Sequence, residues 1–594
     1  MTTRATRGPR RRTVAALMVI LIVLVAFLFR LIDIQVVRAA EHVSDSLSVG
    51  NLGSTQTIAG ADGDIVDADG TVLASSVLVY DTQLDPLLIQ QIEDDEDNEP
   101  EIPWAEASEK IAAITGQKGE DLRLLVAGAL DADPTSRYAL LKNGLSTQKY
   151  LQLKELGLPY LAMFPRSVRV YPNGAVAGNM VGFLDGEGNG QYGIERTEAE
   201  CLAPTNGERS YLSGKGGVII PGSERVTPAV DGGTVKLTID SDLNWYLQQM
   251  IGEEARAQGA KAGSVTVIEV KTGKIRAAAE YPSLDPNDIN SVDPDYWKSQ
   301  IFSDSYEPGS TFKAITAATV IDQGAATPLT TVTAPSREVF PNGAVINDPF
   351  QHGVTQYTLA GALIDSSNVS LSKFGTMVSP QVRYEYLQKF GVGKATGVDF
   401  YSEVTGGVRE PETWDNQTLY TTTFGQAYTV TTAQVAGAYQ AIANDGKKID
   451  LSLVESCTAA DGTVTEAADP ESEQVVSPGT AEQVQELLEN VAVQGSLADR
   501  TKIDGYRIGL KTGSAQKPNG KGGYKQGVYF TSIAGIAPID DPQYVVVVTL
   551  DEPTKLRSSA ANADAFQKAM TQVLKTYRVP PSSEPMEDLL PKTK

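Results

Sequence analysis

The chain has 594 residues, and its 50 basic and 74 acidic side chains give a formal net charge of −24. This balance argues against nucleic-acid binding, because a phosphate backbone would repel the chain. With two histidines and two cysteines, the chain can build neither a histidine-rich metal site nor a disulfide framework. We therefore expect no metal and no cofactor. A Ser-His-Asp triad would depend on His352 alone, and whether Cys201 and Cys457 pair stays open.

The N-terminus departs from the acidic balance. Arginines cluster before residue 13, and an uncharged apolar run follows from Val14 to Phe29. The run approaches the roughly 20 residues that a bilayer requires, and flanking arginines favour the cytoplasmic side. We predict a cytoplasmic basic tail at 1–12 and a single transmembrane anchor at 13–34, with the remainder outside the cytoplasm. The competing interpretation is a cleavable signal peptide ending near Val37 and Ala39.

The next region, 35–228, is predicted to form an elongated, mostly β pedestal domain. Residues 62–74 contain two strand-like runs around Asp69-Gly70, a pair typical of a hairpin turn. An acidic stretch at 93–101 indicates a solvated loop. The segment 104–156 has apolar positions spaced by three and four residues, which predicts helix.

A second domain is predicted at 229–578, after a Gly-rich stretch and a strong strand pattern. Residues 242–257 have helical spacing, and 264–279 indicate a hairpin turning at Thr272-Gly273. Helices between hairpins predict a mixed α/β (α+β) fold with a central antiparallel sheet flanked by helices. We expect the polar segment 579–594 to be disordered. Further helices are predicted around 310–321, 360–378 and 433–444, and adjacent buried strands at 527–540 and 543–550.

Three short motifs occur in one order: Ser310-Thr-Phe-Lys313, Ser366-Ser-Asn368 and Lys511-Thr-Gly-Ser514. The S-x-x-K, S-x-N and K-T-G set is typical of serine acyl-enzymes. Ser310 follows a Pro-Gly turn at the start of a predicted helix, where developing negative charge is favoured. Lys313 lies one turn further along the same face, so its amine can reach the Ser310 oxygen. A buried lysine with a lowered pKa can replace the missing histidine as base.

Each motif alone is weak, since Ser146, Ser370 and Ser514 also have a lysine three residues later and Lys271-Thr-Gly is a second K-T-G. Context separates the candidates. The second K-T-G is placed at a predicted hairpin turn, and only Ser310 combines a turn, a helix start, a downstream S-x-N and a later K-T-G between strands.

Together these motifs resemble class B penicillin-binding proteins, most closely the division-specific transpeptidases of the FtsI type. The resemblance extends from about Arg10 to Tyr577 and includes EPGSTFK around Ser310, FGQAYTVTTAQVAGAYQAIANDG at 424–446 and KTGSAQ at 511–516. In the pedestal it includes RVYP, GIER and LTID. It implies a serine penicillin-recognising transpeptidase domain behind the pedestal.

The resemblance implies that Ser310 attacks the carbonyl between the two terminal D-alanines of a peptidoglycan stem peptide. Lys313 would take the proton of Ser310 during acylation. Ser366 and Asn368 would relay protons and hold the substrate amide. β-Lactams would imitate the terminal dipeptide and leave a slowly hydrolysed ester.

The last motif is expected to bind the substrate. Lys511 would supply positive charge, and Thr512, Gly513 and Ser514 would form the substrate-binding strand. The backbone N–H groups of Ser310 and Ser514 would form the oxyanion hole. Ser514 stands where the family usually has threonine, and this replacement retains the hydroxyl.

The family also implies partners and location. We expect a single-pass protein of the bacterial cell membrane that contacts an FtsW-type glycosyltransferase and other division proteins. One departure concerns Asp62, which stands where the pedestal usually has arginine and puts the local salt bridges in doubt. The alternatives are an elongation-type transpeptidase, a D,D-carboxypeptidase or β-lactamase that uses the same serine, and an inactive scaffold.

Overall fold

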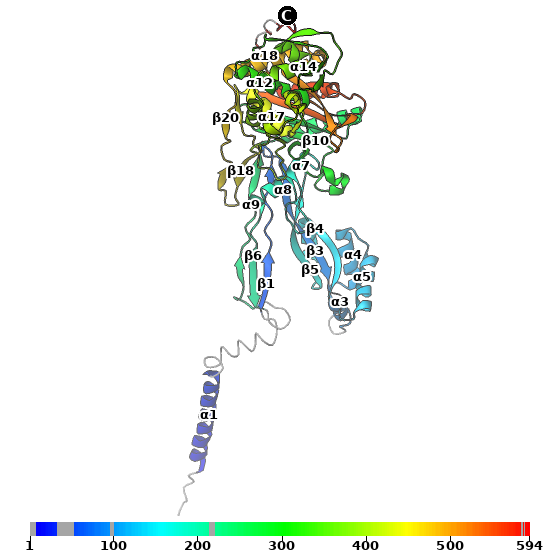
Figure 1. Ribbon diagram of the computed structural model, residues 1–594. Helices are drawn as coiled ribbons and strands as arrows, with labels where there is room; N and C mark the ends of the chain where they lie inside the picture. The colour runs from blue at the N-terminus through cyan, green and yellow to red at the C-terminus, as the bar shows by residue number, and fades with distance from the viewer. Residues whose placement is uncertain (1–7, 33–52, 96–99, 213–219, 584–585, 587–588) are drawn as a thin grey trace, which may run out of the picture. The chain divides into compact units, whose positions relative to one another are not determined.

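The computed structural model describes residues 8–32, 53–95, 100–212, 220–583, 586 and 589–594 (Figure 1). It divides into two compact units. One comprises 1–60 and 204–230, and the other comprises 61–203 and 231–594. The segment predicted as a pedestal therefore contributes to both units, and a boundary at residue 228 stays a prediction.

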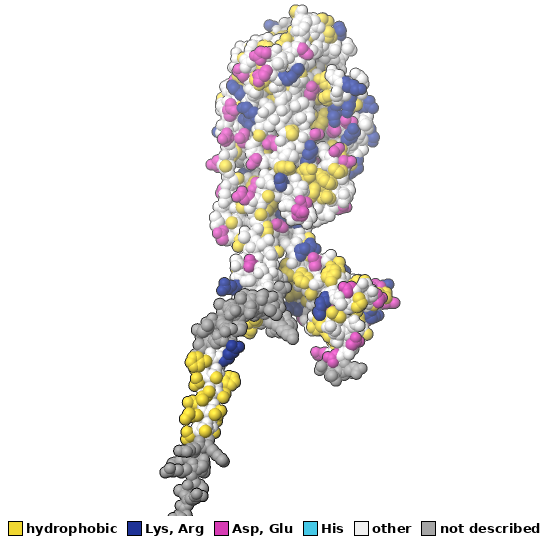
Figure 2. All heavy atoms as spheres, turned by 60° about the horizontal axis from the view of Figure 1, so that its bottom comes forward, with side chains coloured by type: hydrophobic (Ala, Val, Ile, Leu, Met, Phe, Trp, Pro, Cys, Tyr) yellow, Lys and Arg dark blue, Asp and Glu magenta, His cyan; other side chains and the backbone are white. Residues whose placement is uncertain are grey.

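The smaller unit contains a helix and a small sheet. Helix α1 spans Gly8–Ile32, and its described side chains are apolar and exposed from Val14 to Phe29, as the yellow surface of this helix in Figure 2 shows. Within the described residues, no helix meets the combined length and apolarity that a membrane crossing requires. The sheet has three antiparallel strands in the order β1 (Gly53–Ile58), β6 (Gly207–Leu212) and β7 (Arg225–Thr227).

A seven-stranded mixed sheet begins the larger unit. The predicted hairpin is present, with Gly70 at φ 88° in its turn. One strand, β4, interrupts the segment that was predicted as helix. Its alternate residues Ala139, Leu141 and Leu145 are buried, so it pairs with β3 as a half-buried strand. The strands are β2 (Ile65–Val66), β3 (Val72–Leu84), β4 (Ala139–Ser146), β5 (Leu161–Val170), β8 (Thr234–Leu237), β18 (Val454–Thr458) and β19 (Val464–Glu466).

Four helices form a separate small core against the β3–β4–β5 end of this sheet. Ile111 and Leu122 are fully buried there, together with Leu84 of β3 and Leu153 of the last helix. In the acidic stretch predicted as a solvated loop at 93–101, residues 96–99 lie outside the described residues, Glu93 ends the first of these four helices, and residues 94, 95 and 101 are exposed. The helices are α3 (Pro86–Glu93), α4 (Trp104–Thr115), α5 (Gly119–Ala132) and α6 (Thr147–Glu155).

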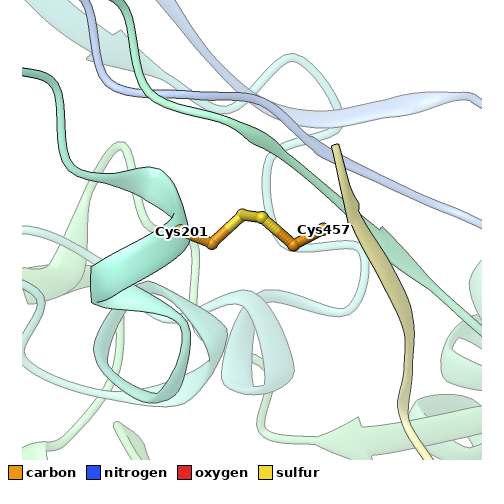
Figure 3. The surroundings of a disulfide bond; sticks show 2 residues. All are labelled: Cys201 and Cys457. Atoms are coloured by element: carbon orange, nitrogen blue, oxygen red, sulfur yellow. A yellow bond between two sulfur atoms is a disulfide. The ribbon is translucent and has the colours of Figure 1, made fainter. Parts of the chain in front are cut away.

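Two links join strands of the mixed sheet to segments outside it. Arg169 and Glu195 form a buried ion pair at 2.7 Å, with side chains 6% and 1% exposed, so a local salt bridge is present near Asp62, on which the Arg169 charge acts. Cys201 of α9 (Ala199–Leu202) and Cys457 of β18 form a disulfide (Figure 3). The pairing left open by the sequence therefore connects segments 256 residues apart.

The predicted central antiparallel sheet is also present. Its strand order is β10 (Ile275–Tyr281), β9 (Ala262–Glu269), β23 (Tyr544–Asp551), β22 (Tyr524–Ala537) and β21 (Gly509–Pro518), with every neighbouring pair antiparallel. Helices α10 (Ser241–Gln258) and α20 (Ala563–Thr576) pack together on it. A second helical layer contains α17 (Thr432–Ala443) and α18 (Pro478–Gln494). Strand β21 is the edge that remains open at one side of the sheet.

The remaining elements surround this core. The predicted helix over 360–378 is broken into two at the Ser366-Ser-Asn368 motif, because Ser366 has a left-handed backbone at φ 58°. The other helices are α7 (Gly178–Val181), α8 (Gly193–Thr197), α11 (Gln300–Ser303), α12 (Lys313–Asp322), α13 (Leu359–Ile364), α14 (Asn368–Gly375), α15 (Pro380–Lys389), α16 (Thr418–Thr421) and α19 (Ala498–Thr501). The other hairpins are β11 (Thr331–Ala334) with β14 (Thr355–Thr358), β12 (Arg337–Val339) with β13 (Val345–Asn347), β15 (Gly407–Val408) with β16 (Tyr428–Thr429), and β17 (Lys447–Ile449) with β20 (Ser472–Gln474).

The prediction of a disordered C-terminal tail does not hold for 589–594. The Thr358 N–H donates to the Lys592 carbonyl oxygen at 3.0 Å, and Lys592 forms an ion pair with Asp365 at 2.9 Å. Leu590 packs against the main hydrophobic core. Apolar burial and backbone pairing thus order a segment whose polar composition indicates disorder.

Candidate active site

Ser310 lies in a tight turn that leads into α12. The turn is a 3-10 helix over Gly309–Phe312, so the predicted helix start is present but begins with a narrower turn. The Thr311 hydroxyl donates to the Pro308 carbonyl at 2.8 Å, and the buried Tyr439 hydroxyl donates to the Thr311 carbonyl at 2.8 Å. These bonds fix the turn while Ser310 itself remains half-buried at the cavity wall.

The segment that follows α16 supports this turn from outside. The Gly309 N–H donates to the Gly425 carbonyl at 2.8 Å. Gly425 has φ 89°, and a Cβ there would overlap the Gly309 carbonyl, so only glycine fits. The Glu307 carboxylate accepts from the Ala427 N–H at 2.9 Å and from the Tyr524 hydroxyl at 2.9 Å. The nucleophile turn is therefore held between this segment and strand β22.

Two fully buried lysines meet at the hydroxyl of Ser366. Lys313 Nζ donates to the Ser366 carbonyl at 2.5 Å and lies 3.1 Å from Ser366 Oγ. Lys511 Nζ lies 3.1 Å from the same Oγ. The sequence predicted that the Lys313 amine would reach Ser310. Among the described residues its hydrogen bonds go to Ser366 instead, because the positive φ of Ser366 turns this residue toward the amine.

Burial makes both amines poor cations. The pKa of Lys313 is lowered well below its usual 10.5, first by desolvation and then by the charge of Lys511, while the charge of Asp348 raises it. Burial lowers the pKa of Lys511 to about 7. A neutral amine has a lone pair that can accept a proton, so the site contains a base near neutral pH without using histidine.

The S-x-N motif forms the link between α13 and α14. Ser366 precedes the N-cap residue Ser367, whose Oγ accepts from the Ser370 N–H at 3.0 Å. The Asn368 side-chain amide donates to the Asn347 carbonyl at 2.9 Å. Ser366 and Asn368 both line the cavity that contains Ser310, as the sequence predicted.

Strand β21 carries the K-T-G motif along the open edge of the central sheet. Thr512 and Ser514 line the cavity. A Cβ at Gly513 would meet Thr311 Cγ2 at 3.0 Å, so the strand approaches the nucleophile turn closely because this residue is glycine. The exposed Ser514 hydroxyl accepts from the Ser559 N–H at 2.8 Å. An edge strand offers unpaired backbone groups to an extended peptide.

These groups surround one cavity of about 760 Å³, a volume within the range of small-molecule sites. Ser310, Ser366, Asn368, Thr512 and Ser514 line it, while the two lysines lie behind its wall. Sequence reasoning missed several lining residues. Gln426 lay within a family motif to which no role was given, and nothing in the sequence pattern marked the others: Asn347, Asp348, Phe350, Tyr529, Ser558 and Ser559.

The competing motif matches have structural explanations. Lys271-Thr-Gly occupies the turn between β9 and β10, with Gly273 at φ 72°. Ser146 is the N-cap of α6. Ser370 is buried in α14, and Lys373 pairs with Glu338 at 2.6 Å. None of these residues lines the cavity that contains Ser310.

Comparison with known proteins agrees with this site. Residues 263–571 match the family model of the penicillin-binding protein transpeptidase domain, and 57–237 match the penicillin-binding protein dimerisation domain. The chain is 32% identical over 595 residues to penicillin-binding protein PbpB of Mycolicibacterium smegmatis, covering 95% of this chain and 90% of that protein. It is 28% identical to peptidoglycan D,D-transpeptidase FtsI of Escherichia coli over 461 residues, which covers 77% and 76%. The crystal structure of penicillin-binding protein 3 of Mycobacterium tuberculosis with aztreonam superposes with a TM-score of 0.69 at 26% identity, covering 91% of this chain and 100% of that chain.

Proposed function

Because the chain belongs to the penicillin-binding protein transpeptidase family, we infer that it is a serine-type peptidoglycan D,D-transpeptidase and propose that it works through a Ser310 acyl-enzyme. The substrate is a stem peptide ending in D-alanyl-D-alanine. The observation that carries the proposal is the junction of Ser366 with two buried amines at 3.1 Å each, beside a serine at the wall of a substrate-sized cavity.

In the acylation step, Ser310 Oγ attacks the carbonyl carbon of the penultimate D-alanine. Lys313 takes the hydroxyl proton, directly or through Ser366, because burial and the neighbouring charge lower its pKa well below the usual 10.5 and so favour the neutral amine. The bond from Oγ to carbon forms and the bond from carbon to the terminal D-alanine nitrogen breaks. The proton then passes to that nitrogen through the Ser366 hydroxyl, so that the leaving group departs as a neutral amine.

Transfer runs the same steps in reverse. The amine of a neighbouring strand attacks the ester carbonyl and loses its proton to Lys313. The bond from carbon to Ser310 Oγ breaks, and Oγ regains a proton through the same relay. The product is a peptide bond between two strands, and the enzyme returns to its starting protonation state.

Charge that develops during the reaction also needs partners. We propose that the N–H groups of Ser310 and Ser514 form the oxyanion hole. The substrate carboxylate would bond the hydroxyls of Thr512 and Ser514 and face the Lys511 charge, and Asn368 would hold the substrate amide. The positions of these groups around one cavity support this assignment.

The test is intact-mass analysis of the full chain in detergent after incubation with a penicillin, beside a Ser310→Ala variant. We expect one stable adduct on the native chain and none on the variant. Slow loss of the adduct separates a transpeptidase from a β-lactamase, which clears it quickly. If the folded native chain takes up no adduct from several β-lactams, the proposal fails and an inactive scaffold is the better interpretation.

We further propose a cell-membrane location, with a single-pass anchor at 13–34 that includes most of α1 and the catalytic region outside the cytoplasm. The apolar side chains of Val14 to Phe29 and the arginines before them support this topology. A cysteine introduced at residue 6 and one at an exposed site of the catalytic region should differ in labelling by an impermeant maleimide on whole cells. Equal labelling of both would contradict it.

We also propose that the cross-linking serves the division septum, in contact with an FtsW-type glycosyltransferase and other division proteins through the pedestal at 35–228. The FtsI-type motifs of the sequence support this role. A fluorescent fusion should concentrate at midcell, and an even distribution along the side wall would favour an elongation role instead.

A further inference from the structure

A buried carboxylate lies directly behind the S-x-N turn. Asp348 follows strand β13 in the cavity wall, and its side chain is 0% exposed. It accepts three hydrogen bonds: from the Val369 N–H at 2.9 Å, from the Ser367 hydroxyl at 2.7 Å and from His352 Nε2 at 2.8 Å. Such donors are what a buried carboxylate requires, and two of the three come from the turn itself.

Two of the three bonds involve alternate residues of the turn, one within the motif and one directly after it. Ser367 and Val369 bond Asp348, while Ser366 and Asn368 face the cavity. Ser366 has φ 58°, a conformation that serine adopts rarely and keeps only where its surroundings fix it. Asp348 supplies that constraint through its bonds to Ser367 and Val369.

His352 provides the third hydrogen bond to the Asp348 carboxylate. Its Nε2 donates to Asp348, and its Nδ1 lies 2.7 Å from the Gly353 carbonyl. The ring packs edge-on against Tyr357 of β14 with centroids 5.6 Å apart. The histidine is thus a support for Asp348, not a member of a Ser-His-Asp triad.

The carboxylate also acts on the catalytic base through its charge. Burial and the charge of Lys511 lower the pKa of Lys313, and the charge of Asp348 opposes both effects. The same charge reaches Tyr357, whose pKa rises to about 12 through burial first and then through Asp365 and Asp348. The ionisable groups around Asp348 are therefore His352 on its own loop, Lys313 on α12 and Tyr357 on β14.

We propose that Asp348, supported by His352, is a positioning residue for acylation, which holds the turn that presents Ser366 and Asn368 and sets the electrostatic environment of the lysine base. This inference rests on the proposed function. Asp348 would then be a fourth element of the site beside the three sequence motifs, and it belongs to none of them.

The test measures the rate of acylation of the full chain by a fluorescent penicillin, over a pH series, in Asp348→Asn. Asparagine has nearly the same shape but puts an amide in place of one acceptor oxygen. We expect the second-order rate constant to fall about tenfold or more, since a buried charged hydrogen bond is lost. Removing the anion lowers the pKa of Lys313 further, so the rising limb of the pH profile should move to lower pH.

A second variant protects the test against misfolding. His352→Ala keeps the carboxylate and removes one donor, so the rate should fall by a smaller factor with the rising limb in place. Asp322→Asn is the matched control, because Asp322 ends α12, accepts hydrogen bonds from the Ser477 N–H and the Thr480 hydroxyl, and does not line the cavity. This variant should keep both the second-order rate constant of acylation and the rising limb of the pH profile close to those of the native chain.

Three results would overturn the inference. Native rates and an unmoved limb in Asp348→Asn would show that the carboxylate does not act on acylation. A slower rate with an unmoved limb and a lowered melting temperature would reduce Asp348 to a general structural role. A native chain that takes up no penicillin would remove the proposed function itself, and this outcome is distinguishable because it precedes any variant.

Discussion

Glu280 offers a quantitative test of how the central sheet responds to pH. It lies on β10 with its side chain buried, and Oε1 accepts from the Ile301 N–H at 3.0 Å. Among the described residues, Oε2 has no hydrogen-bond partner. Desolvation raises the pKa of Glu280 from 4.5 to about 7, and the few donors around it offset this only in part. The folded chain therefore keeps this carboxyl protonated at a pH where the unfolded chain ionises it.

The size of the effect follows from linkage. Between pH 4.5 and about 7 the folded state binds more protons than the unfolded state, so stability decreases as pH rises. The contribution is fully present below pH 4.5 and is lost as pH rises through about 7. At about 1.4 kcal/mol per pKa unit, the difference across this window is about 3 kcal/mol. Glu280→Gln cannot ionise, so it should lack this pH dependence.

The assay is thermal or denaturant unfolding of the full chain at about pH 4 and about pH 8, on either side of the window. Glu280→Gln should match the native chain at the lower pH and exceed its stability at the higher pH by about 3 kcal/mol. Glu253→Gln, on the exposed face of α10, is the control and should keep the native pH dependence. If the native chain and Glu280→Gln show the same pH dependence, the reasoning on burial is refuted.

Three further predictions concern the supports of the site and the fold. Gly425→Ala should slow penicillin acylation about a hundredfold, since misplacing the nucleophile by about 1 Å has such a cost; a native rate would contradict the role of its φ of 89°. Arg169→Met leaves Glu195 buried and unpaired, so the free energy of unfolding should fall by about 3–5 kcal/mol, measured with denaturant. Lys592→Ala removes a partly exposed ion pair with Asp365 and should lower the free energy of unfolding by less than about 1 kcal/mol. Deletion of 589–594 should abolish the hydrogen-exchange protection of the Thr358 amide, which donates to the Lys592 carbonyl. Protection that survives the deletion would refute the docking of the tail.

The chemistry of the site could be predicted because the residues that perform it belong to short local motifs. Ser310, Ser366 and Lys511 each head a motif with its own spacing, and the structure brings all three around one cavity or just behind its wall. The context of each match, with a turn and a helix start at Ser310 and the later motifs downstream, already separated this set from the competing matches. Local turn chemistry was equally readable, as the glycines at the two predicted hairpin turns show.

What the sequence could not provide depends on contacts between distant segments. Asp348 is one of 74 acidic residues, and only its bonds to Ser367 and Val369 give it a role. The pairing of Cys201 with Cys457 requires the fold that brings α9 beside β18. Strand β4 was missed because its apolar residues also fit a helical spacing, and pairing with β3 decided between the two.

Two buried lysines around one hydroxyl explain how a chain with two histidines performs acyl transfer. The Ser366 hydroxyl has a single proton, so it can donate to one amine at a time while it accepts from the other. Burial lowers the pKa of Lys511 to about 7, and burial together with the charge of Lys511 lowers the pKa of Lys313 well below its usual value, against the charge of Asp348. A proton on Lys511, where it can face a substrate carboxylate, therefore favours a neutral Lys313 that can deprotonate Ser310. Replacing Lys511 with a neutral residue would remove both the charge that holds the substrate and the charge that keeps the base unprotonated, so its loss should affect substrate binding and proton transfer together.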